Sequence, residues 1–447
     1  MARDTSKSLR NKVMYQIFVR NFSEGGTFKD VVPQLDRIRD LGVDIIWFAP
    51  IHPIGKKARK GELGSPYAIS DYRSINPEYG TIDDFKAVVG EIHARGMKCI
   101  IDVVYNHTSP DSVLASEHPE WFYHKEDGSF GNHVGDWSDI IDLDYNNREL
   151  WDYQAETLKM WAGIVDGFRC DVAPIIPLEF WQMAREEVAT VRPDCLWLSE
   201  SVEPEFLLAL REMGLTALSD SEIFRVFDVS YEYDVYGDLV SYVTGRGTLD
   251  DYAKALCRQE YIYPDNYVKL RFLENHDQPR AAFLFSNEKS LRNVTAFLFF
   301  QKGMTLLYAG EEYSIKHLPS LFDKDAVRWD KYSVPADSVK GNKSGTNMIC
   351  DPAKDLTDLI RTLSEIKSNE IFTDSTYTVN AVSNSILVAK HKKGEMWALG
   401  VFSLDGEREV ICVDAPDGTY KNLIDGKNID VVHGMIRTYG VPIIILQ

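Results

Sequence analysis

Residues 97–106 read MKCIIDVVYN, and residues 44–50 read DIIWFAP. Nearly continuous apolar runs of this length are typical of parallel strands that are buried on both faces. Similar runs recur along the first three quarters of the chain. They predict eight strands, at residues 13–22, 43–50, 98–106, 165–172, 196–201, 217–221, 268–275 and 305–309.

Amphipathic helical segments separate these predicted strands. One begins at the capping-box pattern Thr81-Ile-Asp-Asp84 and ends at Arg95-Gly96, and others are expected at 180–188, 204–213 and 355–367. A strand–helix unit repeated about eight times predicts a (β/α)8 TIM barrel of class α/β. The alternative is a doubly wound open sheet, but no Gly-rich phosphate loop follows the first strand, which favours the barrel.

Two segments depart from the strand–helix alternation. Residues 107–141 are polar and irregular, which predicts a short inserted subdomain after the third strand. From residue 370 onward the helical pattern stops, and short alternating runs separated by Asp-Gly turns predict a C-terminal antiparallel β domain, a β-sandwich, at 370–447. The barrel would then comprise residues 1–106 and 142–369.

The composition limits the classes of partner. The 447 residues include 49 Lys and Arg against 68 Asp and Glu, a net charge of −19, so nucleic acid is not expected as a partner. No uncharged apolar stretch is long enough to span a membrane, and the first residues contain no signal-like apolar segment. We therefore expect a cytoplasmic protein without a membrane partner. The sequence leaves the oligomeric state open.

Charged and polar residues end four of the predicted strands. These ends read Asp102-Val-Val-Tyr-Asn-His107, Gly167-Phe-Arg-Cys-Asp171, Leu198-Ser-Glu200 and Leu273-Glu-Asn-His-Asp277. In a TIM barrel the carboxyl ends of the strands carry the active site. Charged groups directly after apolar runs are costly to bury unless they line a polar site. We therefore expect these four ends to form one site, although a polar network that only seals the barrel is the alternative.

These segments resemble the four short conserved regions of the α-amylase family of glycoside hydrolases, in the same order. The sequences MYQIFVRNF, GSPYAISDYRSINPEYGT and Tyr308-Ala-Gly-Glu-Glu312 are also similar to that family, so the resemblance covers roughly residues 10–330. It implies retaining cleavage of α-glucosidic bonds through an oxocarbenium-like transition state. Asp171 matches the nucleophile, Glu200 the general acid/base and Asp277 the third carboxylate, which grips sugar hydroxyls.

The resemblance also implies a set of substrate-binding residues. Tyr67 matches an aromatic residue that stacks on the sugar ring, and His107 and His276 match histidines that bind sugar hydroxyls. Arg169 lies two residues before Asp171 on the same strand face, where its charge would keep Asp171 ionised. Glu200, in contrast, needs a raised pKa. Three further aromatic residues at the strand ends or in their loops are expected to face sugar rings: Tyr105, Trp137 and Phe168.

No cofactor is required for this chemistry. Asn106 matches a calcium ligand of the family, and Asp136, Asp139 and Asp142 in the insertion are candidate oxygen ligands. Ile175 stands where many calcium-dependent amylases have a histidine, so a structural Ca2+ remains an open expectation.

The most favoured function is therefore hydrolysis of mainly α-1,4 bonds in maltodextrins, with an α-glucan oligosaccharide as the partner. Three alternatives stay open. These are a same-fold glucanotransferase or isomerase, an α-1,6-acting enzyme, and an inactive carbohydrate-binding member of the family.

Overall fold

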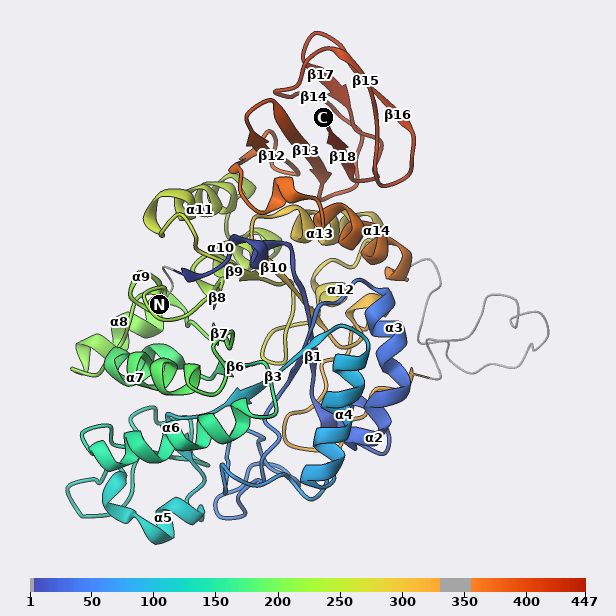
Figure 1. Cartoon of the computed structure of the whole chain (residues 1–447). Coiled ribbons are helices and arrows are strands. Elements are labelled where there is room, and N and C mark those ends of the chain that lie inside the picture. The colour runs from blue at the N-terminus through green and yellow to red at the C-terminus, as the bar shows by residue number, and fades with distance from the viewer. Residues whose placement is uncertain (1–3, 330–354) are drawn as a thin grey trace.

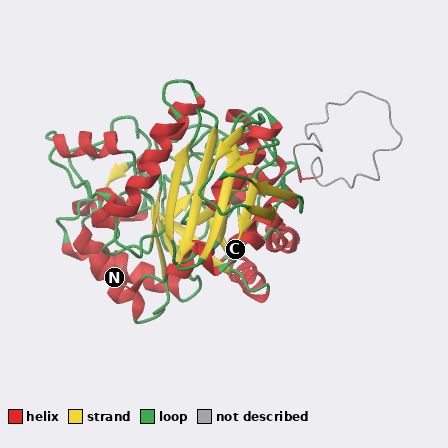
Figure 2. Ribbon diagram, turned by 90° about the horizontal axis from the view of Figure 1, so that it is seen from above, coloured by secondary structure: helices red, strands yellow, loops and turns green. Residues whose placement is uncertain are grey.

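A computed structural model describes residues 4–329 and 355–447. Eight parallel strands close into a barrel in the order β1-β10-β9-β8-β7-β6-β3-β2. In Figure 2, which is seen from above, the strands of the C-terminal part lie nearest the viewer, in the middle of the molecule, with helices around them. The strands of the barrel are β1 Val13–Ile17, β2 Ile45–Phe48, β3 Lys98–Val103, β6 Gly167–Cys170, β7 Leu196–Ser199, β8 Val229–Tyr231, β9 Lys269–Arg271 and β10 Met304–Tyr308.

The helices of the barrel follow its strands along the chain (Figure 1). The expected segment at 81–96 is α4 Ile82–Ala94, which Thr81 and Asp84 cap as the sequence predicts. The remaining helices are α1 Val19–Phe22, α2 Phe28–Val31, α3 Leu35–Asp40, α6 Arg148–Ala162, α7 Leu178–Ala189, α8 Pro204–Glu212, α9 Asp220–Ile223, α10 Tyr233–Val243, α11 Leu249–Ile262, α12 Ala281–Leu284, α13 Glu288–Phe300 and α14 Thr357–Lys367.

One predicted strand is wrong. Residues 217–221 do not form a strand, because Ser219 and Glu222 make a capping box that begins α9. The barrel strand at this place is β8, which lies eight residues further on and has only three residues. A strand this short carries too little alternation for a sequence pattern to reveal it.

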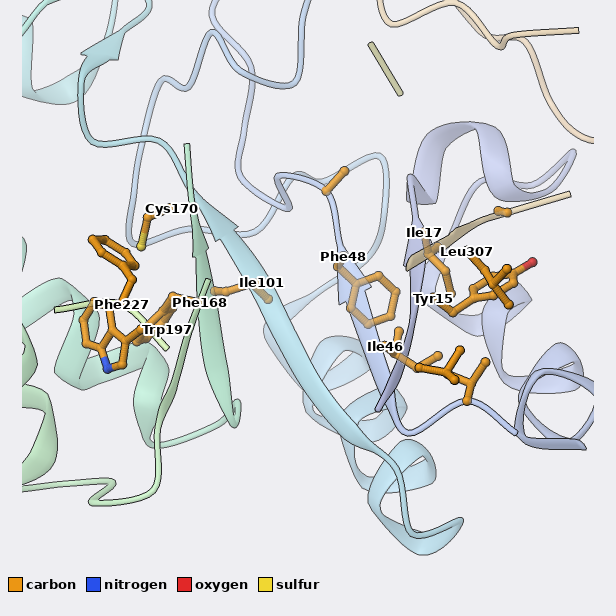
Figure 3. Close-up of a cluster of buried hydrophobic side chains, with 14 of the residues drawn as sticks. Tyr15, Ile17, Ile46, Phe48, Ile101, Phe168, Cys170, Trp197, Phe227 and Leu307 are labelled. Carbon is orange, nitrogen blue, oxygen red and sulfur yellow. The ribbon is translucent and has the colours of Figure 1, made fainter. Parts of the chain in front are cut away.

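The two faces of each barrel strand carry different cores. Met14, Trp47, Leu198 and Tyr231 belong to a cluster that fills the barrel interior. The outward side chains pack beneath the helices in a second, larger cluster. Figure 3 shows part of it, with labelled residues from six strands: Tyr15, Ile17, Ile46, Phe48, Ile101, Phe168, Cys170, Trp197 and Leu307.

The insertion after β3 contains little regular structure. Its first and last strands, β4 His107–Thr108 and β5 Ile141–Asp142, pair with each other and enclose the short helix α5 Val113–Glu117. No helix among the described residues is long and apolar enough to cross a membrane.

The C-terminal part is an antiparallel β domain. A four-stranded sheet, ordered β11-β12-β13-β18, faces two smaller two-stranded sheets across an apolar layer that includes Trp397, Ile411 and Ile436. Helices α13 and α14 lie between this domain and the barrel (Figure 1). Its strands are β11 Thr376–Ala381, β12 Ile386–Lys393, β13 Met396–Ser403, β14 Val410–Cys412, β15 Gly418–Lys421, β16 Asn428–Val431, β17 Met435–Arg437 and β18 Ile443–Leu446.

Candidate active site

A cavity of about 410 Å³ opens at the carboxyl end of the barrel strands. Its size lies within the usual range of small-molecule sites. The predicted carboxyls Asp171, Glu200 and Asp277 all line it. They come from the ends of β6, β7 and β9, so three strands deliver them to one place. The remaining predicted residues on its wall are Tyr67, His107, Trp137 and His276.

Arg169 is the centre of the charge network below this cavity. Its guanidinium is fully buried, and it contacts three carboxyls. One terminal nitrogen, Nη1, donates to Asp102 at 2.8 Å and to Asp171 at 2.7 Å, and the other, Nη2, lies 2.7 Å from Oε1 of Glu200. Three acidic groups therefore share one permanent positive charge.

This arrangement raises the pKa values of the carboxyls. Burial, together with the charges of Asp171 and Asp277 and against the charge of Arg169, raises the pKa of Glu200 to about 8. Burial likewise raises the pKa of Asp171 to about 7, again against the charge of Arg169. Both carboxyls therefore hold a proton more readily than free acids do, and a protonated Glu200 beside an ionised Asp171 is the arrangement that an acid and a nucleophile need.

Val172 helps to hold Glu200, and the sequence analysis missed this. Its backbone N–H donates to Oε2 of Glu200 at 2.7 Å. The residue adopts φ 36°, a left-handed conformation that is strained for a β-branched side chain. The left-handed turn thus comes directly after Asp171, at the residue whose own amide contacts the neighbouring acid. No local sequence pattern marks a valine for this conformation.

Tyr67 and His276 form a neutral pair on one wall. Their rings stack with centroids 5.3 Å apart, and the Tyr67 O–H donates to Asp102 at 3.0 Å. The Gln16 amide lies 2.8 Å from Nδ1 of His276 and can only donate there, so the ring proton sits on Nε2. That Nε2 lies 2.6 Å from the Tyr67 oxygen and 3.0 Å from Asp277. Burial lowers the pKa of His276 to about 4, so the ring is uncharged.

His107 is neutral for the same reason, since burial lowers its pKa to about 4. The Asn106 amide lies 3.2 Å from its Nδ1, which places the ring proton on Nε2. The indole of Trp137 lies 5.6 Å from the His107 ring, and Phe206 lies 6.1 Å beyond Trp137. Both aromatic residues also line the cavity.

Two predicted sugar-facing residues do not reach the cavity. Phe168 is fully buried on the outer face of β6, where its ring packs 5.5 Å from Trp197. Because Arg169 points inward, the residue before it must point to the helices. Tyr105 is buried beneath α6 and donates to the backbone oxygen of Gln154. Both are core residues, and the prediction that they contact sugar is wrong.

The residues expected around calcium do not fit a calcium site. Asp139 pairs with the Lys60 ammonium at 3.0 Å, and Asp142 accepts from both the backbone and ring nitrogens of His133, at 2.7 and 2.8 Å. Asn106 presents its amide nitrogen to Asp142. Nitrogen donors thus take the positions where calcium needs oxygen ligands. Among the described residues, no three His, Cys, Asp or Glu side chains gather as a metal cluster.

The comparisons with known proteins agree with this geometry. Residues 7–358 match the model of the α-amylase catalytic domain, and residues 378–445 match the bacterial α-amylase C-terminal domain. The chain belongs to the α-amylase family. The crystal structure of an α-amylase from Lactobacillus plantarum is 44% identical, covers 99% of this chain and 100% of that one, and superposes with a TM-score of 0.91.

Two other proteins similar to this chain have names that state different activities. A structure described as a noncanonic maltogenic α-amylase from Thermotoga neapolitana is 30% identical, with 98% and 99% of the two chains covered and a TM-score of 0.82. A curated α-1,4-glucan:maltose-1-phosphate maltosyltransferase from Rhodospirillum rubrum is 31% identical over 56% of this chain. That match covers 36% of the relative, so this chain spans well under half the length of the curated protein.

Proposed function

We propose that the protein is a retaining glycosidase that cleaves mainly α-1,4 bonds in maltodextrins. The observation that carries the proposal is the guanidinium of Arg169, which contacts both Asp171 and Glu200 at 2.7 Å. One guanidinium thus joins the two carboxyls, which favours the short separation of about 5–5.5 Å that retaining enzymes use. The family, the neutral sugar-facing histidines and the apolar rings on the wall support an α-glucan as substrate.

In the first step, a carboxylate oxygen of Asp171 attacks C1 of the sugar. The bond from C1 to the glycosidic oxygen breaks, and Glu200 gives its proton to that oxygen, so the leaving sugar departs as an alcohol. The sugar is then an ester of Asp171. Asp277 would hold its hydroxyls and favour the distorted ring of the transition state.

In the second step, Glu200 is a carboxylate and acts as a base. It removes a proton from water, whose oxygen bonds to C1 while the ester bond to Asp171 breaks. Asp171 is released ionised and Glu200 is again protonated, so the cycle closes.

A second candidate function replaces that water by a sugar hydroxyl. Trp137 and Phe206 favour it, because their rings form an apolar wall beside the loop that follows Glu200, where an acceptor sugar could stack. Hydrolysis and transfer then differ only in which hydroxyl enters the second step.

Product analysis tests the proposal and separates the two functions. Purified protein is incubated with maltoheptaose at low and high concentration, and with pullulan for α-1,6 action, and products are separated by chromatography. Shorter maltodextrins at all concentrations support hydrolysis, whereas products longer than the substrate at high concentration support transfer. No turnover of either substrate would contradict the proposed function.

A further inference from the structure

A strap of ten residues, 55–64, lies beside the cavity, and its Lys60 lines the cavity wall. It belongs to the long loop between β2 and α4, and several contacts fix it. At its start, the backbone N–H groups of Lys56 and Lys57 donate to the Asp111 carboxylate at 2.9 and 3.2 Å. In its middle, Lys60 binds the buried carboxylate of Asp139 and the backbone oxygen of Asp136. The strap is therefore tied to the inserted subdomain.

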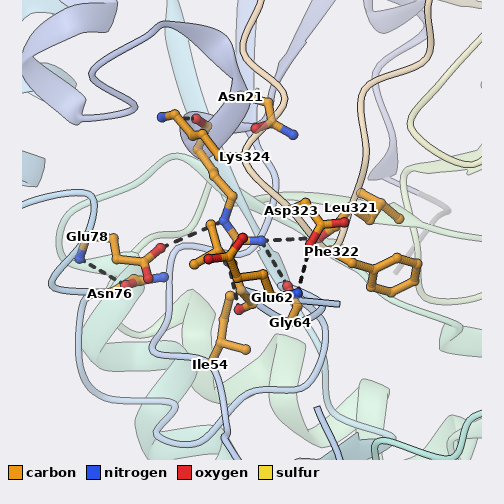
Figure 4. Close-up of polar contacts among 12 residues, drawn as sticks. Asn21, Ile54, Glu62, Gly64, Asn76, Glu78, Leu321, Phe322, Asp323 and Lys324 are labelled. Atoms are coloured by element: carbon orange, nitrogen blue, oxygen red, sulfur yellow. Dashed lines mark hydrogen bonds and ion pairs between the residues drawn. The ribbon is translucent and has the colours of Figure 1, made fainter. Parts of the chain in front are cut away.

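The other end of the strap is tied to the loop after β10, as Figure 4 shows. The backbone N–H groups of Leu63 and Gly64 donate to the Phe322 carbonyl at 2.9 and 3.1 Å. The N–H of Glu62 donates to Asp323 at 2.8 Å. The ring of Phe322 points away from these contacts (Figure 4) and lines the cavity together with Leu321. The strap and the β10 loop thus form one continuous wall.

Two further features hold this wall together. Arg20 is buried beneath it, and its guanidinium donates to the carbonyls of Gly64 at 2.8 Å, Leu321 at 3.2 Å and Leu63 at 3.3 Å. Gly61 has φ +66°, and a Cβ there would lie 2.5 Å from Cβ of Phe322. Only glycine permits the strap to approach this closely.

The topology shows which part of a substrate meets the wall. In the closed barrel, β1 lies four strands from β7 in either direction, and its neighbours are β2 and β10. The wall comes from the loops after β2 and β10, so it stands opposite Glu200 at the end of β7. The acid protonates the departing oxygen, so the leaving sugar lies on its side. The sugar that becomes attached to Asp171, and any units beyond it toward the non-reducing end, point to the wall.

We propose that the strap and Phe322 close the cavity behind the attached sugar, so that the protein acts from the non-reducing end of the chain and releases short products. This inference rests on the proposed function and adds its substrate class, a maltodextrin with a free non-reducing end. An open cleft would instead bind the middle of a chain. Here a longer chain cannot pass between strap and β10 loop, because backbone hydrogen bonds join them.

The test compares two substrates that differ at one end. Both are maltoheptaose labelled at the reducing end, and one also carries an ethylidene group on the two free hydroxyls, O4 and O6, of the non-reducing sugar. We expect kcat/KM for the blocked substrate to be lower by about tenfold or more, because the wall rejects the added group by steric contact. The labelled products of the free substrate should shorten by a constant short unit from the start of the reaction.

Two variants and a matched control assign this preference to the wall. Phe322→Ala enlarges the closed end, and Gly61→Ala forces the strap away from Phe322, so both should reduce the ratio between free and blocked substrate. Gly128→Ala is the control, because Gly128 has φ +81° but a Cβ there meets no atom within 4 Å. It carries the same backbone strain without touching the cavity, and its ratio should match the wild type. Thermal melts report whether each variant is folded.

The outcomes are distinct. Equal rates on free and blocked substrates in the wild type would overturn the inference and leave the proposed function intact. Cleavage of neither substrate would overturn the proposed function itself. A strong end preference that both folded wall variants retain would show that the strap and Phe322 do not cause it.

Discussion

The carboxyls around Arg169 and the carboxyl beside Arg271 are equally buried, yet their charges balance differently. Arg169 forms ion pairs with three carboxyls, those of Asp102, Asp171 and Glu200. Arg271 pairs with Glu232 at 2.9 Å, and the other oxygen of Glu232 accepts the backbone N–H of Phe272. The Nε of Arg271 donates to the carbonyl of Lys302.

This contrast separates a reacting network from a structural one. Burial raises the pKa of Glu232, but its own arginine, the hydrogen bonds of that arginine and a backbone amide all oppose the rise. In the Arg169 cluster the surplus carboxyls cannot all be ionised, so one of them keeps a proton near neutral pH. The number of carboxyls per cation, rather than their burial, therefore distinguishes the cluster that keeps a transferable proton from the structural ion pair. Each of the following substitutions removes a carboxyl from one of the two clusters or tests what that carboxyl contributes.

The largest effect is expected from Asp171→Asn. The amide keeps the size of the carboxyl but cannot attack C1, so kcat/KM should fall by about 10⁴ or more. Since a surplus acid is removed from Arg169, the melting temperature should not fall. Steady-state kinetics on maltoheptaose and a thermal melt measure both. A variant that kept the wild-type rate would contradict the mechanism.

The ion pair between Glu232 and Arg271 should show the opposite result, in which Glu232→Gln lowers stability but leaves activity unchanged. The substitution leaves the buried Arg271 charge uncompensated, which costs about 3 kcal/mol or more of unfolding free energy. The side chain does not line the cavity, so kcat of the folded fraction should stay at the wild-type value. Urea denaturation and kinetics on the same preparation test the pair of outcomes. Lost activity with unchanged stability would reverse the assignment of the two clusters.

Glu200→Gln tests the linkage between protons and stability. The pKa of Glu200 is raised to about 8 in the folded protein, above about 4.3 for an unfolded glutamate. The folded state therefore binds this proton more tightly, and the stability it provides is lost as pH rises from about 4 toward 8. A glutamine at this position does not titrate, so its contribution to the free energy of unfolding stays constant over that pH range.

The variant should thus be more stable than the wild type by about 1–2 kcal/mol at pH 8, with a smaller difference at pH 5. Denaturation curves at both pH values measure the difference. A gap that shrinks as pH rises would show that the proton does not reside on Glu200.

The sequence predicts the barrel well because its strands follow a short periodic rule, and the carboxyls follow directly after those strands. A buried parallel strand is a continuous apolar run, and its carboxyl end is where Asp171, Glu200 and Asp277 stand. The errors have local physical causes. Phe168 neighbours an inward arginine and must therefore point outward, and β8 is too short to show a pattern. Contacts such as the strap on Phe322 or the turn at Val172 depend on segments far apart in the chain, so no single stretch encodes them.

The smallest effect is expected from chelation, and it extends the comparison to the insertion. Asp139 and Asp142 are buried, but each has a nitrogen partner from the chain, Lys60 and His133. Because each acid already has a nitrogen partner from the chain, we propose that no metal is needed to hold them. Added EDTA should leave the melting temperature unchanged. Lys60→Met is the companion variant, since it leaves the Asp139 charge without its partner and should lower the melting temperature. A melt that EDTA shifts downward in the wild type would show that a cation, rather than these nitrogen groups, holds the two acids.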